Sequence, residues 1–94
     1  MKLFVDDIRD PPDPSWTVAR STKDALELCT NEWPLEMALD HDLGGSDRIM
    51  DFLKGLHELC GDRPIPRWTI HSANPVGRLN IESFMNSWER SRKD

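Results

Sequence analysis

The chain has 94 residues, a formal net charge of −5 at pH 7 and a pI near 5.1. This length predicts one domain, residues 1–94, and the acidic balance argues against broad non-specific DNA binding through a basic surface. No apolar stretch approaches the roughly 20 residues of a membrane span, and the start MKLFVDD lacks a signal-peptide run. We therefore expect a soluble, cytoplasmic protein with no membrane partner.

The first two predicted elements are short strands. Residues 2–5 (KLFV) form an apolar run of strand formers that ends in two aspartates, and residues 15–19 (SWTVA) form a second run. Between them, residues 9–14 (RDPPDP) exclude regular structure, because prolines fix φ and remove N–H donors. The first connection is therefore predicted to be a short proline loop without a helix.

A helix and a third strand follow. The apolar spacing over 21–33 predicts a helix with Ser21 as N-cap, and LEMALD over 35–40 predicts a strand. Cys29 falls on the apolar side of this helix, and Cys60 does so in the next one. Two cysteines at such positions are typical of free core thiols in a reduced protein.

The second helix is predicted over 46–61, with Gly61 just past its end. The apolar stripe predicted to be buried consists of Ile49, Phe52, Leu53, Leu56, Leu59 and Cys60. His57 falls on the polar side of the same helix and is interpreted as a surface residue.

The last two elements are a strand over 68–70 and a helix over 74–91. Asn74 is the predicted N-cap of this helix and Pro75 its first residue. The charged end of the chain, residues 89–94, is expected to fray.

Strands that alternate with helices predict a mostly parallel sheet with helices on its faces. The carboxyl ends of parallel strands meet at one edge of the sheet, where ligands bind. Polar residues follow the predicted strands at that edge: Asp6, Asp7, Arg20, Ser21, Asp40, His41, Asp42, His71 and Ser72.

The aspartates at this edge predict a cation site, because clustered carboxylates repel one another unless a cation, an arginine or a proton compensates. Mg²⁺ would suit the oxygen ligands, whereas nearby histidines would favour Mn²⁺ or Zn²⁺. Asp6, Asp7 and Asp42 are the candidate metal ligands. For any one of them, a turn or N-cap role is the alternative.

His41 and His71 are candidates for general acid and base, since imidazole changes charge near neutral pH. The alternative for each is a histidine packed beneath a loop.

Phosphate could bind at the start of the last predicted helix, where Ser72 and Asn74 lie beside free N–H groups, or at the glycines of 44–46. Arg20 and Arg9 could bind a phosphate with two hydrogen bonds. A structural pairing of either arginine with Asp6 or Asp40 is the alternative.

The blocks FVDD and ALDHD resemble the receiver domains of two-component signalling, whose acidic pair holds Mg²⁺ and whose third strand ends in the phosphorylated aspartate. The chain departs from those domains because it has no helix after the first strand, no fifth strand and no lysine following one. It is more similar to the cyclic-phosphate-processing receiver domains of phages and bacteria. Four blocks carry this resemblance in order: FVDDIRDPP, W..ARS, LDHDLGG and HSANPVGR.

The resemblance implies a three-layer, receiver-like (flavodoxin-like) α/β fold with four parallel strands in the order 2-1-3-4. It implies a phosphoesterase that acts on cyclic nucleotides or on RNA ends with a 2′,3′-cyclic phosphate, by acid–base chemistry with or without a divalent metal. The catalytic set would be His41, His71, Asp40 and Asp42. The alternatives are a degenerate response-regulator receiver and a non-catalytic nucleotide- or phosphate-binding module.

Overall fold

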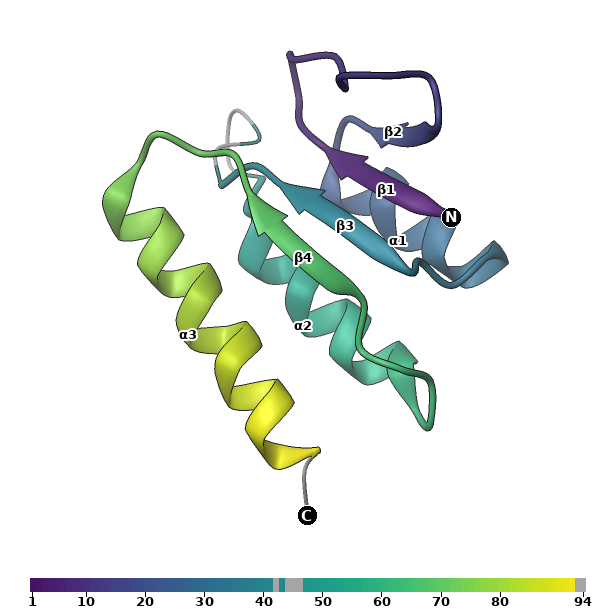
Figure 1. The fold of residues 1–94 in the computed structure, drawn as a ribbon, viewed down its shortest axis with the longest axis vertical. Helices are drawn as coiled ribbons and strands as arrows, with labels where there is room; N and C mark the ends of the chain where they lie inside the picture. Colours follow the sequence, from purple (N-terminus) through teal and green to yellow (C-terminus); the bar gives the residue numbers. More distant parts are fainter. Residues whose placement is uncertain (42, 44–46, 93–94) are drawn as a thin grey trace.

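The computed structural model describes residues 1–41, 43 and 47–92 (Figure 1). All seven predicted elements form. The strands are β1 (Lys2–Val5), β2 (Trp16–Ala19), β3 (Glu36–Leu39) and β4 (Arg67–Ile70). The helices are α1 (Thr22–Asn31), α2 (Ile49–Cys60) and α3 (Pro75–Ser91).

The four strands form one parallel sheet in the order β2-β1-β3-β4, which confirms the predicted topology. In the register, Leu3 lies opposite Thr17 on one side and Met37 on the other. The connection from β1 to β2 has no helix, as the prolines of residues 9–14 predicted. All four strands therefore end at the same edge, and each delivers its following residues there.

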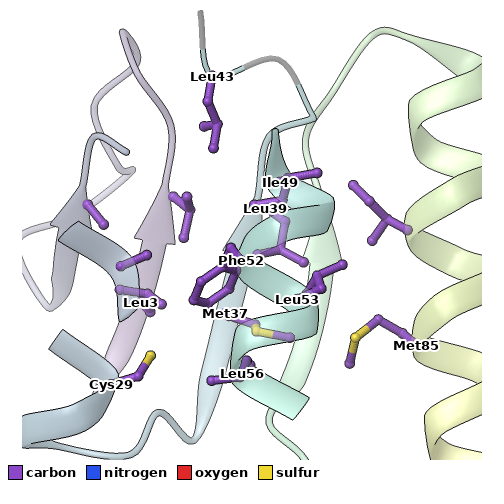
Figure 2. Close-up of a cluster of buried hydrophobic side chains, with 14 of the residues drawn as sticks. Leu3, Cys29, Met37, Leu39, Leu43, Ile49, Phe52, Leu53, Leu56 and Met85 are labelled. Atoms are coloured by element: carbon purple, nitrogen blue, oxygen red, sulfur yellow. The ribbon is translucent and has the colours of Figure 1, made fainter. Parts of the chain in front are cut away.

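The main core lies between one face of the sheet and the helices (Figure 2). Leu3, Val5, Met37 and Leu39 are fully buried and point toward the helices, because alternate residues of a strand face the same side. The helix residues of this core are Ala25, Cys29, Ile49, Phe52, Leu53, Leu56, Cys60, Ile81, Met85 and Trp88. Both cysteines are free and buried, as predicted.

The opposite face of the sheet corrects one expectation, because no helix covers it within the described residues. Helices α1, α2 and α3 all contribute to the single core cluster, so the domain has two layers of secondary structure instead of three (Figure 1). The helix-less first connection explains this difference, since a helix between β1 and β2 would pack on the opposite face. Trp16 and His71 cover Phe4 there with their rings instead, at centroid distances of 6.1 Å and 4.7 Å.

The helix ends follow the sequence signals closely. Ser21 Oγ accepts a hydrogen bond from the Asp24 N–H, and Asn74 Oδ1 accepts from the first turn of α3. Gly61 follows α2 with a φ of 55°, a left-handed value that favours glycine.

One local expectation about the helices is wrong. Leu59 is 40% exposed instead of buried, since α2 turns it away from the sheet. Helix α3 ends at Ser91, as its sequence pattern predicted. Arg92 helps to hold this end, because its guanidinium donates to the carbonyls of Gly61 and Arg63. None of the helices in the described part of the chain is both long and apolar enough to cross a membrane.

Candidate functional site

A cavity of about 340 Å³ lies at the carboxyl edge of the sheet. Three segments line it: the loop after β1, the end of β3 and the turn that leads into α3. Its lining residues are Asp6, Asp7, Ile8, Arg9, Asp40, Ser72, Ala73 and Asn74. Because this cavity contains an acidic cluster, we call it the acidic cavity.

Asp6 is the most buried carboxylate of the acidic cavity, with 1% of the residue exposed. Its Oδ1 accepts hydrogen bonds from the N–H groups of Ile8 (2.9 Å) and Arg9 (2.8 Å). Burial by itself would raise the pKa of Asp6, but these two hydrogen bonds and the neighbouring His71 outweigh it and lower the pKa from 3.8. The Asp6 carboxylate therefore shapes the loop after β1.

His71 is held firmly beside Asp6. Its Nε2 lies 3.0 Å from Asp6 Oδ2, and its ring stacks on Phe4 with an angle of 6° between the planes. Its Nδ1 is buried and has no hydrogen-bond partner among the described residues. With one nitrogen bound to Asp6 and the other buried, this arrangement fits a residue that positions Asp6 better than one that exchanges protons with a substrate.

Asp6, Asp7 and Asp40 form the acidic cluster, in which one carboxylate oxygen from each residue lies within 4.8 Å of the others. The predicted metal set had Asp42 as its third member, and Asp42 lies outside the described residues. Asp40, predicted as a catalytic residue, thus lies beside the acidic pair.

The cluster can be tested for its fit to a divalent cation. Three hydrogen bonds already use both oxygens of Asp6, which leaves about one of its roughly four acceptor positions. His71 Nε2 is occupied by Asp6, so the available donors are carboxylate oxygens. This donor set fits Mg²⁺ or Mn²⁺ better than Zn²⁺.

The two arginines differ in their relation to the acidic cavity. Arg9 lines it, and its Nη1 donates to the His71 carbonyl at 2.6 Å, which ties the loop after β1 to the end of β4. Arg20 donates to the carbonyls of Asp6 and Arg9 and pairs with Asp10 at 2.7 Å. Arg20 therefore holds the loop, and its acidic partner is Asp10, not Asp6 or Asp40 as the sequence suggested.

Ser72 and Asn74 line the acidic cavity but use their side chains locally. Ser72 Oγ accepts from the Asn74 N–H, while Asn74 Oδ1 accepts from the N–H groups of Val76 and Gly77. These two N–H groups were expected to be free for phosphate. The N-cap occupies them instead, so the start of α3 offers less to an anion than the sequence implied.

His41 lies on the other side of the strand from the acidic cluster. Its ring packs against Gly77 so closely that a Cβ at position 77 would lie 2.5 Å from its Nδ1. It lines a separate cavity of about 1100 Å³ between α2 and α3, together with His57, which is exposed as predicted. His41 therefore lines a cavity whose lining does not include His71, and His71 lies beside Asp6 instead.

The alternation of side chains along each strand was the sequence signal that could have separated His41 from Asp6, Asp40 and His71. Residues 2, 4 and 6 share one face of β1 and its extension, as do 36, 38 and 40 in β3 and 67, 69 and 71 in β4. Asp6, Asp40 and His71 follow this alternation, and His41 has the opposite parity. Sequence analysis missed the roles of Phe4 and Gly77, since neither residue type suggests a contact with histidine. The glycines of 44–46 lie outside the described residues.

Comparison with known proteins agrees with the motif resemblance. The family model described as cyclic-phosphate processing receiver domain matches residues 1–87. No curated protein and no solved structure matches the chain.

Proposed function

Because the chain belongs to the cyclic-phosphate processing receiver domain family, we propose that it is a phosphoesterase that hydrolyses cyclic phosphate esters in the acidic cavity. The observation that carries the proposal is that the clustered carboxylates of Asp6, Asp7 and Asp40 share one small cavity with Arg9. Such a cavity combines groups that can accept a proton with a cation that can hold a phosphoryl oxygen.

In this proposal, the role of each residue follows from its contacts in the structure. Arg9 uses one N–H on the His71 carbonyl and has further donors for a phosphoryl oxygen. Asp40, 9% exposed, takes a proton from the attacking water. The water oxygen bonds to phosphorus, one ring ester bond breaks, and the leaving oxygen takes a proton from solvent. His71 keeps Asp6 charged and in place.

Asp7 and Asp40, with Asp6 behind them, are the residues that would hold a divalent cation. When bound, such an ion would neutralise charge on the phosphate. His41 is assigned no proton transfer in the acidic cavity, because its ring faces the cavity between α2 and α3.

The test is hydrolysis of a panel of nucleoside 2′,3′-cyclic phosphates and 3′,5′-cyclic mononucleotides, followed by ³¹P NMR. Each reaction is run with EDTA, Mg²⁺, Mn²⁺ or Zn²⁺. Asp40→Asn is expected to lower kcat at least about 100-fold, whereas Asp62→Asn, an exposed change after α2, should keep full activity. Absence of turnover with every substrate and ion would refute the enzymatic function.

A second candidate function is that of a phosphorylated receiver. The grouping of Asp40 with the Asp6 and Asp7 pair supports it, since receivers combine an acceptor aspartate with an acidic pair. We expect acetyl phosphate with Mg²⁺ to leave the protein mass unchanged, because no lysine is among the described residues that line the acidic cavity. A stable gain of one phosphoryl group that Asp40→Asn abolishes would favour the receiver.

A further inference from the structure

Ile8 is an exposed apolar residue in a cavity that, apart from Ile8 and Ala73, is lined by polar residues. At 79%, it is the most exposed of the five large apolar side chains that are exposed in the described part of the chain. The other four are Leu35, Leu59, Val76 and Leu79. Among these five, Ile8 alone also lines the acidic cavity, beside the carboxylates and Arg9.

The backbone around Ile8 is fixed by several hydrogen bonds. The Ile8 N–H donates to the buried Asp6 Oδ1 at 2.9 Å, and the next N–H, of Arg9, donates to the same oxygen. Arg9 and Arg20 then tie the loop to the end of β4 and to β2. The Ile8 side chain therefore projects from a loop that several hydrogen bonds hold in place. Its position depends on Asp6, which also lines the acidic cavity.

An exposed isoleucine contributes little to folding, because its apolar surface stays in water. Ligand sites, in contrast, combine a few convergent polar groups with apolar walls that contact the organic part of the ligand. Ala73 is exposed and lines the same cavity from the segment before α3. Ile8 and Ala73 thus supply apolar surface to a cavity that also contains the acidic cluster.

We propose that Ile8 determines the substrate class by packing against the nucleoside part of a cyclic phosphate ester while Arg9 and the acidic cluster bind its phosphate end. The domain would therefore prefer nucleoside cyclic phosphates to small alkyl cyclic phosphates. This inference rests on the proposed function, because it assigns the nucleoside part of that function's substrate to the apolar side of the acidic cavity.

The test compares Ile8→Ser with wild type on two substrates, a nucleoside 2′,3′-cyclic phosphate and ethylene cyclic phosphate. The variant should lose about 10-fold in kcat/KM on the nucleoside substrate, mainly through KM, and keep its rate on ethylene phosphate. Ile8→Val should retain most of the nucleoside rate. Leu35→Ser is the matched control, since Leu35 is 64% exposed and lies just before β3, at the opposite edge of the sheet.

A binding arm separates failure of this inference from failure of the proposed function. Calorimetry compares a nucleoside 2′-monophosphate with inorganic phosphate on each variant, without requiring turnover. If Ile8→Ser keeps the wild-type preference for the nucleoside in both assays, the role of Ile8 is refuted while hydrolysis stands. If neither substrate is hydrolysed, the proposed function fails, and selective loss of nucleoside monophosphate binding in Ile8→Ser would still support the role of Ile8.

Discussion

Alanine at position 77 should destabilise the protein, although alanine favours helices more than glycine does. Gly77 lies in the first turns of α3 and is buried against the imidazole of His41. An added Cβ would lie 2.5 Å from Nδ1 and 2.6 Å from Cδ2 of that ring. The ring is rigid, so relief requires a movement of α3 or a rotation of His41.

The magnitude follows from two opposed terms. Replacing a helical glycine by alanine gains about 1 kcal/mol in helix propensity, and overpacking a filled site costs about 1–3 kcal/mol. With three ring atoms affected, we expect the upper half of that cost and a net loss of about 1–2 kcal/mol in the free energy of unfolding. In a His41→Ala background the obstructing atoms are gone, so Gly77→Ala should stabilise by about 0.5–1 kcal/mol.

Urea unfolding of the four proteins in this double-mutant cycle measures the coupling, which should reach about 1.5–3 kcal/mol. Other contacts that His41 makes cancel in the cycle. Gly61→Ala is the control: its φ of 55° penalises alanine, and a Cβ there would meet nothing within 4 Å, so its cost should be the same with or without His41. If Gly77→Ala has the same effect in both His41 backgrounds, the packing of this ring on α3 is refuted.

Three further predictions concern buried polar and thiol groups. Folding lowers the pKa of Asp6 from 3.8, so the ionised carboxylate stabilises the fold fully above its unfolded pKa, and this stabilisation disappears as pH falls through the folded pKa. Below about pH 4, Asp6→Asn should therefore lose less stability than the wild type loses, as measured by acid unfolding curves. His71→Ala removes the hydrogen-bond partner of Asp6 Oδ2 and uncovers Phe4, so thermal and urea unfolding should show a loss of about 1–3 kcal/mol in the free energy of unfolding. A variant as stable as the wild type would contradict the positioning role of His71. Burial raises the pKa of Cys29 to about 11. In a Cys60→Ser variant, Cys29 should therefore react with thiol reagents at pH 8 only as fast as the protein unfolds. Rapid labelling of the native state would be inconsistent with this burial.

The sequence by itself determined the elements and their order along the chain. Prolines in residues 9–14 excluded a helix after β1, and Ser21, Asn74 and Gly61 marked helix ends, because these signals act through local backbone chemistry. The alternation of strands and helices also placed Asp6, Asp7, Asp40 and His71 at one edge, since parallel strands all end on the same side. These inferences needed no knowledge of which residues touch.

Only the tertiary structure decided how the edge residues divide. Strand pleating sends Asp40 and His71 toward one face and His41 toward the other, so the two histidines predicted as general acid and base lie apart. His41 lines the cavity between α2 and α3, and His71 lies beside Asp6. Hydrogen bonds within the protein decided the roles of Arg20 and of the first N–H groups of α3. Asp10 and loop carbonyls hold Arg20, and Asn74 takes the N–H groups that a phosphate could have used. Such partners come from segments that folding brings together, and local sequence patterns do not encode which of several nearby acceptors a long side chain will reach.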